Sequence, residues 1–367
     1  MPLELSNVSI PEECLEAWAS RPSKPRRAAP RLVDLTVDLG PVTVPVDTGI
    51  TAEQCLPLPE NYRFPSKGGA KKAAERALFA LAAGRNTYIW GMPGTGKDAI
   101  VHAYSALTRR PCVMVTFRPG TDIAPWFYAR SYSVAGGTSW EYGALWNALI
   151  GGIKGRDGKS RPALVLLSDV DRADSAQAEW FRILTDSISG RILGPDGSMH
   201  PVFPGTQFVC TANSCGTGDS RGRMVSANPM DASILDRLGR AIEFTYLAWE
   251  DESQVLREKF PVVCEKDPDL IGQLQGCCEA LRKAIANEEL YGEFTHRGIC
   301  EVLLECQDRI FFLGKVEKNL LAQGFKAWLE RLDADNRLVA KRLIDPFLKS
   351  GALAPESDSD SEEPPAF

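Results

Sequence analysis

Residues 87–98 read Thr-Tyr-Ile-Trp-Gly-Met-Pro-Gly-Thr-Gly-Lys-Asp, and the expected fold follows from this stretch. Its first four residues predict a β-strand, whereas residues 99–107 follow a helical pattern. The glycines between them let the backbone curl so that successive N–H groups face one phosphate, and the dipole of the following helix attracts the same anion. We therefore predict a phosphate-binding loop that consists of Gly91, Met92, Pro93, Gly94, Thr95, Gly96, Lys97 and Asp98.

The last two positions of this loop carry opposite charges. Lys97 can neutralise the β- and γ-phosphate oxygens of a nucleoside triphosphate. Asp98 stands where such loops normally have a hydroxyl residue that binds Mg²⁺. Because a carboxylate repels the triphosphate unless a cation lies between them, Asp98 either binds Mg²⁺ or disables the site.

A second acidic motif, Ser168-Asp-Val-Asp-Arg-Ala173, follows an apolar strand pattern. ATPases of this type usually carry Asp-Glu-x-Asp-Arg-Ala there. The shared Asp171-Arg-Ala aligns Ser168 with the aspartate on the metal side and Asp169 with the glutamate that polarises the attacking water. The carboxylate therefore stands at position 98, where a hydroxyl is usual, and the hydroxyl stands at position 168, where an aspartate is usual. We interpret Asp98 and Ser168 as joint Mg²⁺ ligands.

Two other interpretations of this motif stay open. In the first, the motif has decayed, and the site binds nucleotide but hydrolyses it slowly. In the second, the alignment shifts by one residue, so that Asp169 is the Mg²⁺ ligand and Val170 stands in place of the base. The second alternative predicts an inactive site.

Strands alternate with helices from about residue 69, which is typical of an α/β fold with a parallel sheet. Five strands are expected at 87–90, 112–117, 163–167, 207–211 and 241–246. They predict a three-layer αβα sandwich with a five-stranded parallel sheet. After Trp249 the pattern is helical. The predicted divisions are an accessory N-terminal arm at 1–60, a nucleotide-binding domain at 61–249, a helical domain at 250–350 and a disordered acidic tail at 351–367.

The segment 267–288 shows the helical periodicity most clearly. Asp267 is expected to cap this helix, with Pro268 in its first position. One apolar face is expected to be buried, and it consists of Leu270, Leu274, Cys278, Leu281 and Ile285.

The composition excludes several classes of protein. With 44% hydrophobic and 25% charged residues, the chain is neither wholly disordered nor fibrous. Most of its net charge of −6 comes from the last thirteen residues, so no positive field is expected to recruit nucleic acid. No apolar run is long enough to span a bilayer. Ten dispersed cysteines favour free thiols, and we expect a soluble cytoplasmic protein.

From about residue 58 to 309 the chain resembles AAA+ ATPases, in particular the clade of MoxR-type proteins, dynein-related domains and the ATPase subunit of cobaltochelatase (CobS-type). The phosphate loop and the acidic motif carry this resemblance. So does a β-hairpin pattern at 189–201, with Pro-Asp-Gly at its tip. The most specific match is Phe208-Val-Cys-Thr-Ala-Asn-Ser-Cys-Gly-Thr-Gly-Asp219, which is similar to a run in cobaltochelatase-type proteins.

The resemblance implies roles for three further residues. Asn213 matches sensor 1, an amide that orients the attacking water or holds the γ-phosphate. Arg237, in Leu-Asp-Arg-Leu, matches the arginine that reaches the γ-phosphate of a neighbouring subunit, and Arg240 is the reserve candidate. Arg297 matches sensor 2 of the lid, although the family's Ser-Pro-Arg has become Thr-His-Arg here.

The same resemblance implies ATP and Mg²⁺ as ligands and a homo-oligomeric ring, expected to be a hexamer. The implied activity is ATP hydrolysis that remodels a partner protein, which in this clade often has a von Willebrand A-type fold. A motor that acts on nucleic acid and a structural ring that hydrolyses slowly remain the alternatives. The aromatic run 126–128 is expected either in a pore loop or in the core, with equal weight.

Overall fold

The computed structural model describes residues 36–348 except 133–136, 187, 189, 217, 219–227 and 231. The chain divides into two compact units, Met1–Asp251 and Glu252–Phe367. Most of the predicted arm (1–35) and the whole predicted acidic tail lie outside the described residues. None of the described helices is long and apolar enough to cross a membrane.

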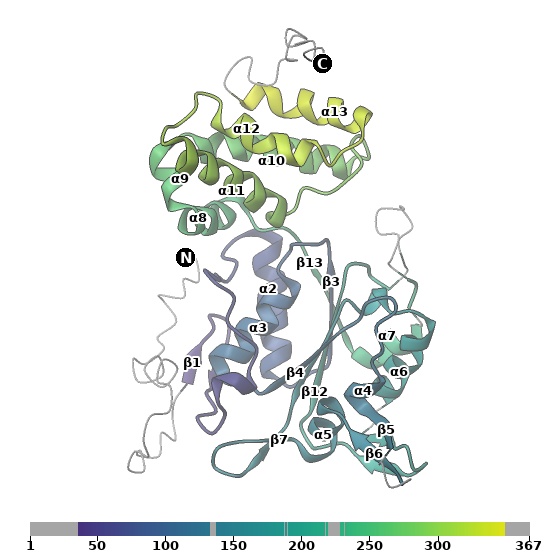
Figure 1. The fold of residues 1–367 in the computed structure, drawn as a ribbon. Helices are drawn as coiled ribbons and strands as arrows, with labels where there is room; N and C mark the ends of the chain where they lie inside the picture. The colour runs from purple at the N-terminus through teal and green to yellow at the C-terminus, as the bar shows by residue number, and fades with distance from the viewer. Residues whose placement is uncertain are drawn as a thin grey trace, which may run out of the picture. The chain divides into compact units, whose positions relative to one another are not determined.

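The first unit is built on a parallel sheet of five strands, which confirms the prediction (Figure 1). Its order is β13-β3-β12-β9-β4. The strands are β3 (Thr87–Gly91), β4 (Cys112–Thr116), β9 (Leu164–Ser168), β12 (Gln207–Ala212) and β13 (Arg240–Phe244). Every residue of β9 and β12 is buried, because helices cover both faces of the sheet.

Alternation along the strands divides the core into two layers. Leu164 and Leu166 of β9 pack on the face covered by α2 (Gly68–Ala82) and α3 (Lys97–Thr108). Val165 and Leu167 pack on the opposite face. That face is covered by α4 (Ala124–Phe127), α5 (Ala144–Gly151), α6 (Ser175–Asp186) and α7 (Ala232–Leu238), as Figure 1 shows. The predicted three-layer sandwich is confirmed.

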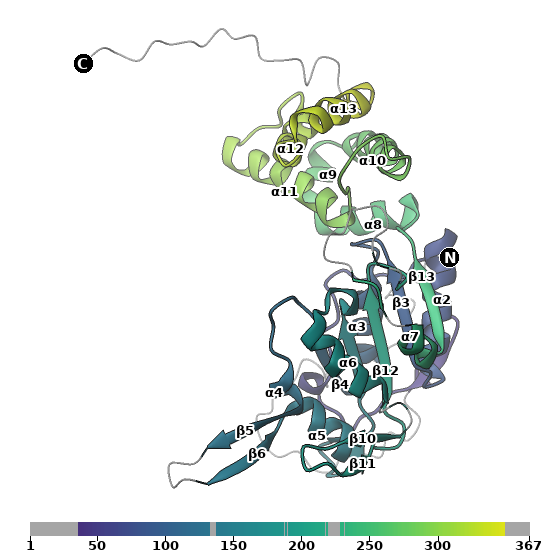
Figure 2. The same ribbon diagram turned by 90° about the vertical axis from the view of Figure 1, so that its right-hand side faces the viewer.

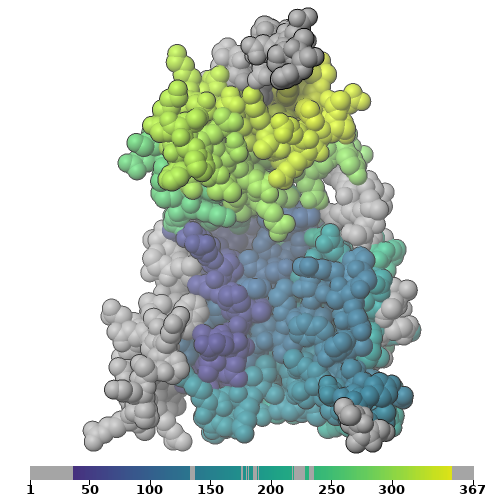
Figure 3. Space-filling model, in the orientation of Figure 1, coloured from purple at the N-terminus to yellow at the C-terminus, as the bar shows by residue number. Residues whose placement is uncertain are grey.

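Residues 36–58 extend the core on the α2–α3 face. β1 (Thr36–Asp38) pairs with β2 (Thr43–Pro45), a short 3₁₀ helix follows at Ala52–Gln54, and Val37 and Leu39 are fully buried in the same cluster as α2 and α3. In the space-filling view this N-terminal segment lies over the α/β unit (Figure 3). The sequence predicted an accessory arm up to residue 60, but its described part packs as part of the α/β core.

The first unit contains three further antiparallel hairpins. β7 (Ile153–Lys154) pairs with β8 (Ser160–Arg161), and the expected hairpin at 189–201 is present as β10 (Arg191–Leu193) and β11 (Met199–Pro201). The sequence analysis did not predict the pair β5 (Tyr128–Tyr132) and β6 (Thr138–Tyr142), which extends away from the sheet (Figure 2).

The aromatic run 126–128 divides between core and surface. Phe127 is fully buried and stacks on Trp180, with ring centroids 4.6 Å apart. Tyr128 is partly buried and packs edge-on against Trp146. Only Trp126 is exposed, with 37% of its surface accessible. Two of the three rings therefore pack against the core, and Trp126 presents the exposed ring.

The second unit is helical in all its described residues, as predicted. Its helices are the larger part of α8 (Trp249–Lys259), then α9 (Pro261–Lys266), α10 (Leu270–Ala286), α11 (His296–Leu313), α12 (Leu320–Leu329), α13 (Ala334–Ile344) and a 3₁₀ turn at Asp345–Phe347.

The predicted buried face of α10 is confirmed, and the start of this helix is corrected. All five apolar side chains named above are buried, and so is Cys277. The helix begins at Leu270 with Asp269 in the N-cap position, later than the sequence predicted. The carbonyl of Asp267 instead accepts a turn hydrogen bond from the N–H of Leu270.

Candidate nucleotide-binding site

The phosphate loop leaves the sheet at the end of β3 and enters α3 at Lys97. Gly91, Gly94 and Gly96 have φ values of 150°, 75° and 84°, which side chains disfavour. At Gly91 there is also no room, because a Cβ atom would lie 2.1 Å from the carbonyl oxygen of Phe244 on β13. The glycines therefore set the loop's curvature and its close approach to the neighbouring strand.

Lys97 lies across the inside of the loop and is almost fully buried. Its Nζ donates to the carbonyl oxygens of Gly91 (2.7 Å) and Met92 (3.1 Å). It also donates to Oδ1 of Asn213 (3.0 Å) at the end of β12. The structure thus brings the predicted lysine and the predicted sensor 1 amide into direct contact.

Asp98 and Ser168 also meet. Ser168, the last residue of β9, donates through Oγ to Oδ2 of Asp98 at 3.0 Å. Thr211 of β12 donates through Oγ1 to Oδ1 of Asp98 at 2.6 Å. The two hydroxyl oxygens are 3.4 Å apart. One carboxylate and two hydroxyl groups from three separate segments therefore form one oxygen-rich cluster beside Lys97.

Asp169 follows Ser168 directly and lies in a left-handed turn with φ of 55°. Nδ2 of Asn213 lies 3.5 Å from its Oδ1, and a guanidinium nitrogen of Arg172 lies 3.9 Å from its Oδ2. Burial, together with repulsion from the Asp98 carboxylate, raises the pKa of Asp169 above its usual value. This shift makes Asp169 a better proton acceptor than an ordinary aspartate.

Asp171 positions the turn that carries Asn213. Its buried Oδ2 accepts hydrogen bonds from the backbone N–H groups of Asn213 (2.8 Å) and Ser214 (3.0 Å). Two donors that would otherwise be buried without partners are satisfied by one carboxylate. This role of Asp171 was not predicted from the sequence, where the residue served only to align the acidic motif.

Thr211 is the second residue that sequence reasoning missed, although a signal for it exists. Side chains alternate along β9 and β12, and Leu166 and Val209 both pack on the α3 face. Ser168 and Thr211 each follow two residues later, so the same period places both hydroxyl groups on the side of Asp98.

The two predicted arginines lie elsewhere in the chain. Arg237 is exposed in the last turn of α7. Arg297 is exposed near the start of α11, in the helical unit. Their assignments to a neighbouring subunit and to the lid stay predictions.

The chemistry of the oxygen cluster fits Mg²⁺. Among the described residues, no three His, Cys, Asp or Glu side chains gather as a complete metal site. Mg²⁺ does not require such a set, because it usually takes one or two carboxylates together with substrate phosphates and water. Asp98 with Ser168 or Thr211 would supply the protein share of an octahedral oxygen shell, and Asp169 is the only other carboxylate that the sequence analysis nominated.

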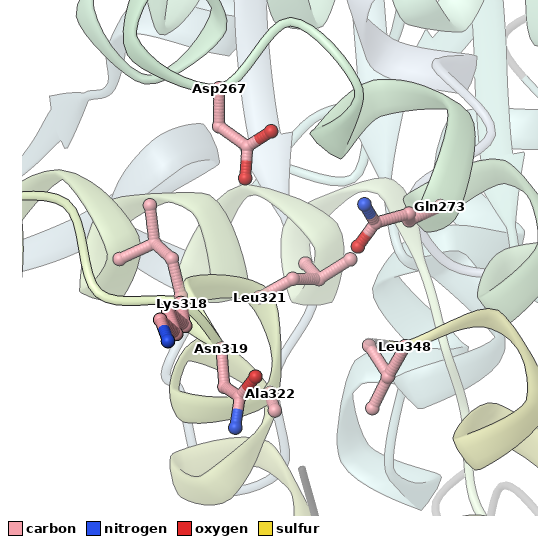
Figure 4. Close-up of a pocket in the computed structure, with 8 residues that line it drawn as sticks. Asp267, Gln273, Lys318, Asn319, Leu321, Ala322 and Leu348 are labelled. Atoms are coloured by element: carbon pink, nitrogen blue, oxygen red, sulfur yellow. The ribbon is translucent and has the colours of Figure 1, made fainter. Parts of the chain in front are cut away.

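A separate shallow hollow lies in the helical unit, and it has no enclosed space large enough for a water molecule. Figure 4 shows Asp267, Gln273 and Leu321 around it. Its full lining is Asp267, Gln273, Lys318, Asn319, Leu320, Leu321, Ala322 and Leu348. None of these residues was predicted to bind nucleotide, so the candidate site is the cluster at the strand ends and not this hollow.

A family model matches most of the α/β part of the chain. Residues 86–238 match the family described as the AAA domain of the dynein-related subfamily. Among solved structures, a mutant of RuvB from Thermotoga maritima matches the chain with a TM-score of 0.46 and 12% sequence identity over 77% of this chain and 78% of that one. No curated protein matches the sequence at a significant level.

Proposed function

We propose that this chain, in which residues 86–238 form an AAA domain of the dynein-related subfamily, binds and hydrolyses ATP with Mg²⁺ as the motor of a ring that remodels a partner protein. The observation that carries the proposal is the cluster at the carboxyl ends of β3, β9 and β12. There, Lys97 is hydrogen-bonded to Asn213, and Ser168 is hydrogen-bonded to Asp98. Ligands of open α/β sheets bind at this edge.

The loop and Lys97 would bind the phosphates. The N–H groups of the loop residues other than Pro93 would face the anion, and Nζ of Lys97 would exchange the carbonyl oxygens of Gly91 and Met92 for β- and γ-phosphate oxygens. Asp98, with Ser168 and Thr211, would hold the cation. When bound, Mg²⁺ neutralises the charge that develops on the phosphates during transfer.

Asp169 and Asn213 would act on the attacking water. Asp169 accepts its proton, and the raised pKa of this carboxylate suits that task. Asn213, linked to both Lys97 and Asp169, orients the water relative to the γ-phosphate. Arg237 of a neighbouring subunit would stabilise the charge of the transition state, so that hydrolysis depends on assembly.

The ring and its partner are proposed from the family. AAA proteins work as oligomeric rings, and a hexamer with a MoxR- or CobS-like role in protein remodelling fits this domain. Exposed aromatic side chains on the β5–β6 hairpin, Tyr132 and Tyr142, offer apolar contacts for a polypeptide. A partner of the von Willebrand A type is the first to test.

The test is ATP binding and phosphate release by the full chain, with and without Mg²⁺. Lys97→Ala should weaken ATP binding about 100-fold, because a buried cation that contacts phosphate contributes roughly 3 kcal/mol. Lys72→Ala, at an exposed position of α2, is the matched control and should bind ATP as the unmodified chain does. Equal affinity of Lys97→Ala and the unmodified chain would refute the proposal.

A further inference from the structure

A second cluster of ionisable groups lies in the helical unit, far along the chain from the phosphate loop. It is centred on Glu252 of α8, whose side chain is 1% exposed. Arg282 of α10 donates to both of its oxygens, at 2.7 and 2.9 Å. His296 at the start of α11 lies with Nδ1 3.0 Å from Oε1. Glu252 therefore joins three helices that lie together in this unit (Figure 2).

The cluster ends at a thiol. Nε2 of His296 lies 3.5 Å from Sγ of Cys300, one turn further along α11. Nζ of Lys259, an exposed residue of α8, lies 3.6 Å from the same sulfur. Cys300 is thus not an isolated cysteine. It terminates a carboxylate–imidazole–thiol series and has a second cationic group beside it.

This arrangement favours the ion pair of a thiolate and an imidazolium. Burial opposes ionisation of Cys300, but the hydrogen bond and charge of His296, with the charge of Lys259, outweigh burial and lower its pKa. Burial also opposes a charged His296, yet its hydrogen bonds to Cys300 and Glu252 raise the pKa of this imidazole to about 9. Arg282 and Glu252 orient the imidazole and balance its charge.

The other cysteines of this unit are in different surroundings. Cys277, Cys278 and Cys306 are fully buried, and burial raises the pKa of each thiol. Cys264 is partly exposed, and burial raises its pKa as well. Among the described cysteines, only Cys300 lies between an imidazole and an ammonium group within 3.6 Å. Cys300 retains 9% exposure, whereas Cys277, Cys278 and Cys306 retain 1% or less.

We propose that Cys300 is a modification site that reacts with hydroperoxides. Its Sγ attacks one oxygen of the peroxide, so that an S–O bond forms and the O–O bond breaks. The leaving hydroxide or alkoxide takes the proton of the His296 imidazolium and departs as water or alcohol. Sulfur is oxidised to a sulfenic acid and the peroxide is reduced. The site goes beyond the proposed ATPase function and does not depend on it.

Oxidation changes the charge at the junction of α8 and α11. The thiolate that faces His296 and Lys259 becomes a neutral sulfenic acid, while Glu252 and Arg282 keep their contacts. The ionic contact between Lys259 of α8 and Cys300 in the second turn of α11 is weakened, three residues beyond Arg297. Oxidation of Cys300 would therefore change the charged contacts between α8 and α11 in the helical unit.

The experiment follows the rate of modification at each cysteine of the full chain. The protein is treated with hydrogen peroxide at pH 7, sulfenic acid is trapped with a 1,3-dicarbonyl probe, and each peptide is quantified by mass spectrometry. Cys300 should be labelled about tenfold faster than Cys215, which is exposed. If labelling follows exposure alone, with Cys215 first, the proposal is overturned.

Two variants test the cause of the reactivity. Lys259→Met, at an exposed position, and His296→Gln should each slow labelling of Cys300 several-fold and move the pH midpoint of its alkylation by iodoacetamide upward. Lys266→Met, at an exposed position of α9, is the matched control and should change neither. Unchanged rate and midpoint in Lys259→Met would contradict the proposal even if His296→Gln does not fold.

Discussion

Asp98 at the phosphate loop and Glu252 in the helical unit both accept several hydrogen bonds, but from donors of different charge. The carboxylate of Asp98 accepts from the neutral hydroxyl groups of Ser168 and Thr211. The carboxylate of Glu252 accepts from the guanidinium of Arg282 and from His296, whose pKa is raised to about 9. Hydroxyl groups orient a carboxylate without neutralising it, whereas cations do both.

The pKa values of Asp169 and Glu252 show the consequence of this difference in donor charge. Burial and the charge of Asp98 raise the pKa of Asp169, so the ionisation of this second carboxyl group beside the loop is unfavourable. Burial also opposes ionisation of Glu252, but its bonds to His296 and Arg282 outweigh burial and lower its pKa. In the proposed function the first centre receives a cation, whereas the carboxylate of the second centre already has cationic partners within the helical unit.

The largest effect expected from this comparison is on stability. Glu252→Ala leaves the partly buried guanidinium of Arg282 and the imidazole of His296 without their shared carboxylate. We expect the free energy of unfolding of the helical unit to fall by about 3 kcal/mol. Denaturant unfolding of the full chain measures the change.

The matched control lies two residues earlier on the same helix. Glu250 pairs with Lys67 at the surface, and both side chains are mostly exposed, so Glu250→Ala should have little effect. The pH dependence has a definite sign. Because the pKa of Glu252 is lowered from its usual 4.5, its contribution is present above pH 4.5 and is lost as pH falls below it. Equal loss in both variants would contradict the distinction between the two environments.

A smaller effect on stability, with the opposite sign, is expected at the first centre. The raised pKa of Asp169 means that its ionised form opposes folding as pH rises through its folded pKa. Asp169→Asn should therefore increase thermal stability modestly at pH 7 while it lowers ATP turnover about 100-fold. Differential scanning fluorimetry and phosphate release measure the two quantities.

The stabilising effect of Asp169→Asn should disappear at low pH, because Asp169 is then protonated in both the folded and the unfolded chain. A gain in stability that persists unchanged below pH 4 would show that charge is not its cause. Unchanged turnover in Asp169→Asn would show that this carboxylate does not accept the proton of the water.

The smallest effect is expected at Thr211. Thr211→Val removes one hydroxyl group from Asp98 and retains the shape of the side chain. The concentration of Mg²⁺ needed for half-maximal ATP hydrolysis should rise about fivefold, which corresponds to roughly 1 kcal/mol for one hydrogen bond. Thr211→Ser keeps the hydroxyl and should remain close to the unmodified chain. An identical Mg²⁺ requirement in both variants would remove Thr211 from the proposed cation site.

Local patterns in the sequence were sufficient to predict the sheet, the loop and most of the site. Glycine spacing identified the loop, and the acidic motif placed Ser168 and Asp169 at a strand end. Contacts across the sheet were harder to predict. Thr211 was missed because its hydroxyl acquires a role only when β12 lies next to β9, and Asp171 because it acts on a turn 42 residues later.

The remaining features depend on contacts between distant parts of the chain. The β5–β6 hairpin was not predicted because its strands are mostly polar, and the period of buried residues is weak there. Glu252, Arg282 and His296 come from three helices and form no sequence motif. Only His296 and Cys300 are one helical turn apart, and that spacing alone does not distinguish a reactive pair from core packing.

The exchange between Asp98 and Ser168 is tested most directly by Mg²⁺-dependent ATP hydrolysis in Asp98→Ser, Ser168→Asp and the double variant. The first single variant leaves no carboxylate at position 98 or 168, and the second replaces a hydroxyl that lies 3.0 Å from Asp98 by a second carboxylate, so both should lose most activity. The double variant restores one carboxylate and one hydroxyl, and Thr211 lies within reach of either position. We predict recovery to within about tenfold of the unmodified chain. A double variant no more active than the worse single variant would contradict the account.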